Sequence, residues 1–247
     1  MLINSKSNIA NIAILGASGY TGAESIRLLM NNVNYKIINL TADSKAGNNI
    51  SEIFPHLRGI DLPKLMKVED LDFSKIDGVL SCLPHGKTQN ILAKIPKHIK
   101  ICDLSADFRF NDPNLYEKVY EKKHDAINLQ KEAVYGLTEI NRKKIIEARL
   151  IANPGCYPTS VLLPLIPLLN KGLISDEDII IDSKSGVSGA GRTLKENLLF
   201  GEVSDGFTAY GLGTHRHRPE IQTQLNYVNN SNIKVVFTPH LLPIKRG

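Results

Sequence analysis

Short apolar runs of strand length alternate with segments of helical periodicity along the first part of the chain. Four of these runs are predicted to form buried strands: Ala10–Leu15, Tyr35–Thr41, Ile76–Leu83 and Ile99–Leu104. Ala23–Met30 and Thr88–Lys94 lie between such runs and carry apolar residues at helical spacing. This order predicts a right-handed βαβ unit near the N-terminus, within a parallel sheet that has helices on both faces. The expected fold class is therefore α/β.

The pattern changes after about residue 150. Ile179–Ser183, Lys234–Thr238 and the glycine-rich segments between them predict longer strands of a different sheet. We therefore place a domain boundary just before Cys156, with residues 1–154 on one side and 155–247 on the other. Thr238–Gly247 runs on from a strand without a closing helix or a polar tail, so we expect the chain to be a fragment of a longer protein.

Composition and charge narrow the class of ligand and the compartment. The net charge of +5 favours anionic ligands, but the basic residues are scattered, which indicates a small phosphate-bearing ligand rather than nucleic acid. The three cysteines form no CxxC pair, so we expect neither a disulfide framework nor a metal site, and reduced thiols suit the cytoplasm. Met1–Ala10 lacks the apolar core of a signal peptide, and no apolar run is long enough to span a membrane.

A glycine-rich turn follows the first predicted strand. Gly16, Gly19 and Gly22 form G-x-x-G-x-x-G between that strand and a predicted helix. Glycines there let the backbone approach a pyrophosphate, and the helix N-terminus offers free N–H groups to it. A tight turn that only packs helix on strand is the alternative. Because strand and helix flank the turn on the expected sides, we favour dinucleotide binding.

The segment after the second predicted strand leaves the choice of dinucleotide open. Asp43 stands where an acidic residue would hold the ribose 2′-OH of NAD. Ser44 and Lys45 follow it and can instead contact the 2′-phosphate of NADP. The residues alone support either cofactor.

Cys156 is the candidate nucleophile. It follows a Pro-Gly turn in Asn153–Ser160 and precedes the apolar segment Val161–Leu169, which places its sulfur near the start of a helix. A helix N-terminus stabilises a thiolate. A small buried hydrophobe is the usual role of a free cysteine, and Cys82 and Cys102 fit that role because they lie inside apolar strands.

Two histidines are candidates for proton transfer to and from this thiol. His215 and His217 alternate with Arg216 and Arg218, and an imidazole can act as acid or base near neutral pH. The alternative is a solvated basic loop. In an extended segment both imidazoles would lie on one face, so alternation does not choose between them. Pro219 restrains the chain beside His217, and we therefore favour His217.

These features together resemble the N-acetyl-gamma-glutamyl-phosphate reductases, a family found in plants and bacteria. The matching blocks run in order from Ile14 to Gly247. They are GASGYTGAE, TADSKAG, FPHLRG, CLPHG, DLSADFR, VYGLTEI, ANPGCYPTS, SGVSGAGR, HRHRPEI and TPHLLPIKRG.

The resemblance implies a two-domain oxidoreductase of arginine biosynthesis. Residues 1–154 would form a Rossmann domain that binds NADP(H), and residues 155–247 part of an α+β catalytic and dimerisation domain. Cys156 would attack the acyl phosphate, release phosphate and hold a thioester. Hydride from NADPH would then give N-acetyl-L-glutamate 5-semialdehyde. The expected partners are this small acyl-phosphate substrate and further copies of the chain in a dimer or tetramer, with no nucleic acid and no membrane, in the cytoplasm.

The resemblance also carries over roles for individual residues. Cys156 and His217 would be catalytic, and Arg109, Asn153 and His215 would bind substrate, with Arg109 on its phosphate. The residues expected to contact the cofactor are Gly16, Ser18, Gly19, Tyr20, Thr21, Gly22, Ser44, Lys45, Pro84, Ser188 and Gly189. His85 and Gly86 belong to the same nicotinamide-flanking turn as Pro84.

The sequence departs from the family pattern in two places. The family carries Arg where this chain has Ser44, which weakens the expectation of NADP over NAD unless Lys45 substitutes. The family also continues past residue 247.

An aspartate-semialdehyde dehydrogenase would share the fold and chemistry, although NPGCYPT and HRHRPEI argue against it. A non-catalytic dinucleotide-binding protein would need only the glycine turn, and the pairing of Cys156 with His217 favours an enzyme over it.

Overall fold

The computed structural model describes residues 9–229 and 232–246, which form two compact units. Unit 1 comprises the described residues up to Phe108 together with His124–Asn153. Unit 2 comprises Arg109–Lys123 and the described residues from Pro154 onwards. The prediction that Met1–Ala10 is not a signal peptide falls mostly on residues 1–8, which lie outside the described residues. No helix of the described part is long and apolar enough to cross a membrane.

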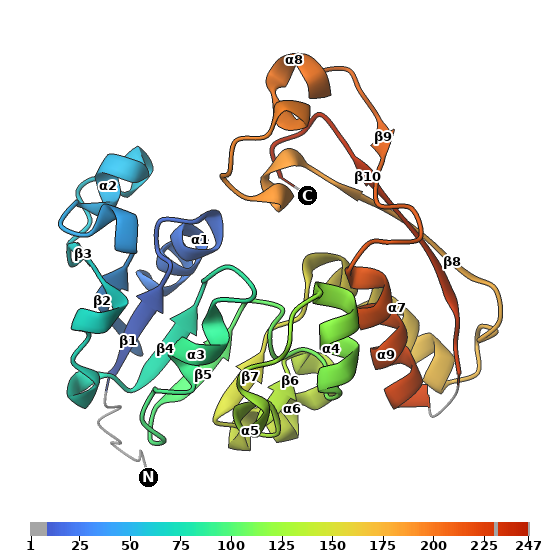
Figure 1. The fold of residues 1–247 in the computed structure, drawn as a ribbon, viewed down its shortest axis with the longest axis horizontal. Helices are drawn as coiled ribbons and strands as arrows, with labels where there is room; N and C mark the ends of the chain where they lie inside the picture. Colours follow the sequence, from blue (N-terminus) through green and yellow to red (C-terminus); the bar gives the residue numbers. More distant parts are fainter. Residues whose placement is uncertain (1–8, 230–231, 247) are drawn as a thin grey trace, which may run out of the picture. The chain divides into compact units, whose positions relative to one another are not determined.

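Unit 1 is built on a seven-stranded sheet within the described residues, in the order β3-β2-β1-β4-β5-β7-β6, and every pair in it is parallel. Its strands are β1 (Ala10–Leu15), β2 (Tyr35–Thr41), β3 (Leu65–Met66), β4 (Gly78–Ser81), β5 (Lys100–Asp103), β6 (Ala133–Tyr135) and β7 (Leu150–Ala152). β1 lies between β2 and β4 (Figure 1). The strand order reverses at this point, and in open parallel sheets ligands bind at the carboxyl ends of the strands there.

The helices of unit 1 cover both faces of this sheet, as the alternation predicts. They are α1 (Tyr20–Leu29), α2 (Ile50–Ile53), α3 (Thr88–Leu92), α5 (Ile127–Gln130) and α6 (Thr138–Glu147). Successive side chains of β1 enter opposite cores: Ile14 packs in the cluster that includes α1, and Leu15 in the cluster that includes α3. Both are fully buried, and burying each such side chain contributes roughly 1.5–3 kcal/mol. A strand buried on both faces reads as a continuous apolar run.

Unit 2 packs two helices on each other beside a three-stranded sheet (Figure 1). Its elements are α4 (Pro113–Tyr120), α7 (Cys156–Asn170), β8 (Ile179–Ser185), α8 (Phe200–Val203), β9 (Thr208–Ala209), α9 (His217–Asn229) and β10 (Val235–Leu241). β10 lies in the middle of this sheet, parallel to β8 and antiparallel to β9. α7 keeps its helical form through Pro164 and Pro167 because its apolar side chains, Leu162 among them, are buried. Tertiary packing here overrides the cost of a proline inside a helix.

The structure corrects the expected course of the chain in two places. Residues 109–123 were assigned to the first domain, but they belong to unit 2, where Tyr116 of α4 is fully buried and the Arg216 guanidinium lies 5.3 Å from the centre of the Tyr120 ring. The glycine-rich stretch between β8 and β10 was expected to form strands. It contains 3₁₀ turns, the short helix α8 and the two-residue strand β9.

Candidate active site

Cys156 is the first residue of α7, and its side chain is exposed. Gly155 is the N-cap of this helix and provides no side-chain cap, so the first turn presents backbone N–H groups that no N-cap side chain accepts. The sequence therefore placed this thiol correctly at a helix N-terminus, where the helix dipole favours a negative charge.

Gly155 brings two predicted site residues to the start of α7. A Cβ atom at this position would lie 2.6 Å from Nε2 of His217 and 3.0 Å from Nη1 of Arg109. Only glycine leaves room for both side chains. His217 and Arg109 are thus brought together against the residue that precedes Cys156.

Glu220 joins the same cluster and was missed by the sequence analysis. Its buried carboxylate accepts a hydrogen bond from the Gly155 N–H at 2.9 Å through Oε1 and pairs with Arg109 Nη1 at 3.1 Å through Oε2. Glu220 lies three residues after His217 on α9, so both side chains are on one face of that helix. This signal stood in the sequence, but it requires a helix where an extended segment was expected.

That expectation of an extended segment for the two histidines was wrong. α9 begins at His217, and the His217 N–H donates to Nδ1 of His215 at 3.1 Å. Pro219 falls in the first turn of the helix, where a missing N–H costs nothing. The imidazoles nevertheless lie close together, with ring centres 5.0 Å apart.

Tyr157 and Tyr210 surround the imidazole of His215. The ring of Tyr157 lies 5.6 Å from that of His215, and its hydroxyl is hydrogen-bonded to the Tyr210 hydroxyl at 3.0 Å. Burial lowers the pKa of His215, and the charge of Arg216 lowers it further. Since Nδ1 accepts the His217 N–H, the neutral ring carries its proton on Nε2. Burial also raises the pKa of Tyr210, with smaller contributions from Tyr157 and Cys156.

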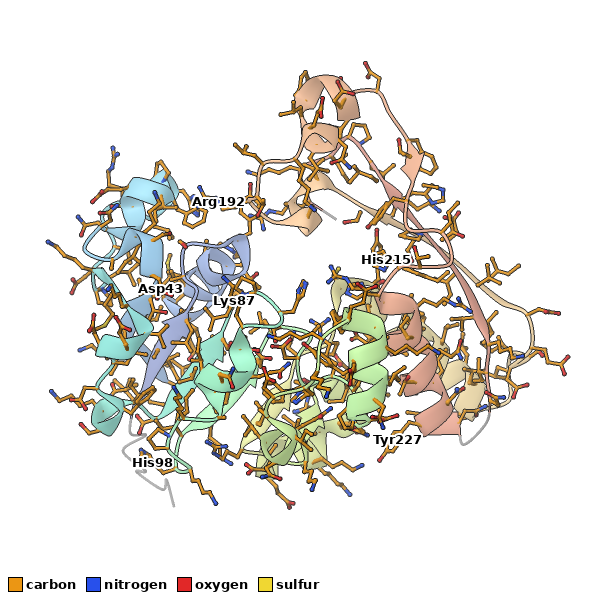
Figure 2. The ribbon with its side chains drawn as sticks, in the orientation of Figure 1. Asp43, Lys87, His98, Arg192, His215 and Tyr227 are labelled. Carbon is orange, nitrogen blue, oxygen red and sulfur yellow. The ribbon has the colours of Figure 1, made fainter. Side chains whose placement is uncertain are left out.

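A cavity of about 490 Å³ in unit 2 adjoins these side chains. Tyr210 and His215 line it, together with residues of the Val187–Ala190 turn such as Gly189. Ser188 lies in the same turn. Figure 2 labels His215, which lies two residues before the start of α9. The Tyr210 and His215 side chains give this cavity an aromatic and imidazole wall, as is usual for a pocket that binds a small molecule.

The glycine turn of unit 1 fits a dinucleotide. Gly16 has a φ of +74°, and a Cβ there would lie 2.7 Å from the Cys82 carbonyl oxygen, while one at Gly22 would lie 2.6 Å from the Cα of Ala17. These two glycines allow the tight turn and the close packing of α1. Gly19, in contrast, would meet only the Gly16 oxygen at 3.6 Å. It is the N-cap of α1 without a side-chain cap, which leaves this helix start open to a phosphate.

The remaining cofactor candidates of unit 1 also follow strand ends. Ser18, Tyr20 and Thr21 belong to the turn and the first residues of α1. Ser44 and Lys45 are exposed in a 3₁₀ turn, Asp43–Lys45, directly after β2. Pro84 lies in the loop between β4 and α3, and Figure 2 labels Asp43 and Lys87 on these two loops. Asn153, which was predicted to bind substrate, follows β7. Its backbone N–H donates to the Asp103 carbonyl at 2.8 Å and so links the end of β7 to that of β5.

Two further thiols are chemically unlike Cys156. Burial raises the pKa of Cys82 to about 11 and that of Cys102 to about 12. Both therefore stay protonated at neutral pH and act as small apolar groups. Among the described residues, no cluster of His, Cys, Asp and Glu is arranged to hold a metal ion.

A parallel sheet with a glycine turn, followed by a second α+β unit that presents a cysteine at a helix start, defines a two-domain dehydrogenase of the type that binds a nicotinamide dinucleotide. Residues 11–148 match the NAD-binding domain of semialdehyde dehydrogenases, and residues 156–247 match the dimerisation domain of the same proteins. The chain belongs to the semialdehyde dehydrogenase family and, within it, to the N-acetyl-gamma-glutamyl-phosphate reductases.

The relatives support this assignment over almost the whole chain. The N-acetyl-gamma-glutamyl-phosphate reductase of Rhodospirillum rubrum is 55% identical over 96% of this chain and 69% of its own length. A probable chloroplastic reductase of Arabidopsis thaliana is 55% identical over 96% of the chain, which spans 59% of that protein. Aspartate semialdehyde dehydrogenase II of Vibrio cholerae shares the fold, with a TM-score of 0.68, 15% identity and coverage of 95% of this chain and 71% of that one.

Proposed function

We propose that this protein catalyses the NADPH-dependent reduction of N-acetyl-gamma-glutamyl phosphate to N-acetyl-L-glutamate 5-semialdehyde, with release of phosphate. The observation that carries the proposal is the exposed thiol of Cys156 at the start of α7, with the His217 imidazole packed against the preceding Gly155. The similarity to reductases of this name supports the choice of substrate.

Covalent capture by Cys156 is the first step of the proposed mechanism. Its thiolate attacks the acyl carbon, a C–S bond forms, and the C–O bond to phosphate breaks, which leaves a thioester and inorganic phosphate. The N–H groups of the first turn of α7 stabilise the negative charge on the carbonyl oxygen. This splits one difficult reduction into two easier steps. NADPH, when bound, supplies the hydride that converts the thioester into aldehyde and free thiolate.

His217 is the proposed acid and base. It accepts the thiol proton before the attack and returns a proton to the sulfur when the aldehyde leaves. His215 holds the start of α9 through its Nδ1 and forms part of the substrate pocket. We propose that Arg109, whose Nη1 lies beside Gly155 and Glu220, binds the phosphate of the substrate, and that Asn153 binds substrate as well.

Residues 1–154 form the cofactor domain, apart from the 109–123 segment, and residues 155–247 form part of the catalytic and dimerisation domain. The cofactor is NADP(H), held by the glycine turn, the Ser44–Lys45 turn and the loop of Pro84. Ser188 and Gly189 stay predicted cofactor contacts. The protein forms a homodimer or homotetramer in the cytoplasm, to be tested by light scattering and by cell fractionation.

The test is the reverse reaction with purified protein. N-acetylglutamate semialdehyde, phosphate and NADP should give NADPH, and aspartate semialdehyde should react far more slowly. Cys156→Ser should abolish the reaction while the dissociation constant for NADPH stays within about twofold, because the residue lies outside the glycine turn. Preference for aspartate semialdehyde would indicate the other dehydrogenase, and NADPH binding without turnover of either aldehyde would indicate a binding protein.

A further inference from the structure

A buried acidic side chain in unit 1 has no place in the mechanism above. Asp107 is fully buried just beyond the carboxyl end of β5. Its Oδ1 accepts the Gly86 N–H at 2.6 Å, and its Oδ2 accepts the hydroxyl of Thr88. Both donors belong to the loop between β4 and α3 or to the first turn of α3. One carboxylate therefore fixes the far end of that loop.

The near end of the same loop is fixed against the glycine turn. The Cys82 N–H donates to the Leu15 carbonyl at 2.8 Å, and the Cys82 carbonyl oxygen occupies the place that a Cβ on Gly16 would need. Gly86 has a φ of +78°, a conformation that side chains disfavour and that its N–H bond to Asp107 helps to hold. The loop is thus held between the glycine turn and Asp107.

A second carboxylate, that of Asp103, is linked to Asp107 through the hydroxyl of Ser105. Asp103 is fully buried at the end of β5 and accepts the hydroxyl of Ser105, whose oxygen in turn accepts the Asp107 N–H at 3.1 Å. The hydroxyls of Thr88 and Ser105 lie 3.0 Å apart. Asp107 is therefore part of a hydrogen-bonded network that fixes its side-chain conformation. A substitution of Asp107 should change the conformation of the loop, because the loop's hydrogen bonds depend on this side chain.

We infer that Asp107 is a positioning residue for the dinucleotide: it holds the Pro84–Gly86 turn in the conformation that binds the cofactor. The inference rests on the proposed function, in which this turn flanks the nicotinamide. Asp107 acts through Gly86 and Thr88 and does not itself touch the cofactor. Its substitution should therefore weaken NADPH binding while the chemistry of the thiol in unit 2 is preserved.

The conservative variant Asp107→Asn should retain most of this effect. Its side-chain oxygen still accepts the Gly86 N–H, and its amide N–H₂ faces Thr88. The Thr88 hydroxyl can accept from that amide and turn its own proton toward Ser105, 3.0 Å away. Asp107→Ala offers no acceptor to either donor.

The experiment measures the NADPH dissociation constant by fluorescence titration, the rate at which iodoacetamide alkylates Cys156, and steady-state kinetics. Asp107→Ala should raise the dissociation constant and the KM for NADPH by about tenfold or more, the value expected for a lost hydrogen bond to a charged group. The alkylation rate and the KM for phosphate should change less than about twofold, and Asp107→Asn should bind NADPH within about threefold of the unsubstituted protein.

Two variants separate positioning from stability. Leu150→Ala removes a fully buried side chain of β7 in the same unit, so it should lower the melting temperature without weakening NADPH binding. Thr88→Val removes one donor to Asp107 and keeps the side-chain shape, so it should give an intermediate loss even where Asp107→Ala fails to fold.

Three results would overturn the inference: NADPH binding by Asp107→Ala or Thr88→Val equal to that of the unsubstituted protein, a loss in Asp107→Asn as large as in Asp107→Ala, or an equal loss in Leu150→Ala. If the unsubstituted protein itself binds no NADPH, the proposed function fails, and the inference fails with it. That outcome is distinguishable because it appears before any substitution is made.

Discussion

The backbone N–H of Gly155 donates to the buried carboxylate of Glu220 at 2.9 Å, so the residue before the candidate nucleophile is anchored to α9. The same carboxylate pairs with Arg109. One acidic side chain therefore sets the position of the start of α7 and of the proposed phosphate-binding guanidinium. Neither relation is visible from sequence spacing, because the partners lie 65 and 111 residues apart.

We predict that Glu220→Ala destabilises the protein by about 3–5 kcal/mol, because it leaves the Arg109 guanidinium buried without its carboxylate. Glu220→Gln keeps an oxygen for the Gly155 N–H and should cost less. Urea unfolding of both variants measures the difference. Glu196→Ala, at an exposed position of the same unit, is the control. A loss no larger in Glu220→Ala than in this control would show that the pair does not hold unit 2 together.

The two histidines should differ in kinetics. His217→Ala is expected to lower kcat by about 10²–10⁴-fold, the usual cost of a positioned acid or base, and to remove one limb of the pH–rate profile. His215→Ala should lower kcat less and should instead destabilise the protein by about 1 kcal/mol, because His215 Nδ1 accepts an N–H at the start of α9. Steady-state rates from pH 5 to 9 measure the losses in kcat, and urea unfolding of His215→Ala measures the change in stability. A larger kcat loss in His215→Ala would reverse the two roles.

The buried network in unit 1 makes stability depend on pH. Burial raises the pKa of Asp103 from 3.8 to about 6, with a further increase from Asp107, while hydrogen bonds from Ser105 oppose the increase. The folded state therefore holds this proton more tightly than the unfolded state, and stability is lost as pH rises from about 4 to 6. The contribution is about 3 kcal/mol at 1.36 kcal/mol per pH unit.

Asp103→Asn should remove this dependence. We expect the difference in the free energy of unfolding between the two proteins to change by up to about 3 kcal/mol between pH 4 and pH 7, with the variant gaining as pH rises. Urea unfolding at several pH values measures it. A difference that stays constant with pH would mean that the carboxyl of Asp103 titrates normally.

Ser44→Arg should sharpen selectivity for NADPH over NADH. Ser44 is exposed in the turn after β2, and an arginine there offers a planar, permanently charged group that pairs with a phosphate. The ratio of kcat/KM for the two cofactors should rise by about tenfold, the equivalent of one charged hydrogen bond. Lys45→Ala should lower the same ratio if Lys45 contacts the 2′-phosphate. An unchanged ratio in both variants would place the cofactor ribose elsewhere.

The elements that periodicity identified best are those whose structure depends on local pattern. β1 and β2 have the predicted bounds. Ile12–Leu15 of β1 is a continuous apolar run that is buried on both faces. β2 begins with exposed residues and is buried only at its end, Leu40–Thr41. α1 begins three residues before its predicted start, because Gly22 packs on Ala17 inside the helix rather than in the turn. β4, the strand before α3, is shorter than predicted. The end of its apolar run belongs to the loop that packs against Gly16 and donates a hydrogen bond to Asp107.

The candidate site was predicted as a set of residues but not as an arrangement. Cys156 at a helix start followed from its neighbours in the chain. The helical form of the segment from His217 did not, because a proline two residues later favours extended structure locally and is tolerated in a first helical turn. Because this helix was not predicted, Glu220 was not recognised as a residue of the site. Whether the named residues perform their proposed roles is decided by the variants above.

The insertion of residues 109–123 into unit 2 means that the chain passes between the units at Phe108–Arg109, at Lys123–His124 and at Asn153–Pro154. A gene fusion that exchanged this protein's first 154 codons for those of a relative would therefore transplant Arg109 and α4 with the wrong half. Glu220 would then have to form its ion pair with an arginine supplied by the relative. A fusion that keeps this ion pair within one parent protein must therefore exchange residues 1–108 and 124–153 and retain residues 109–123.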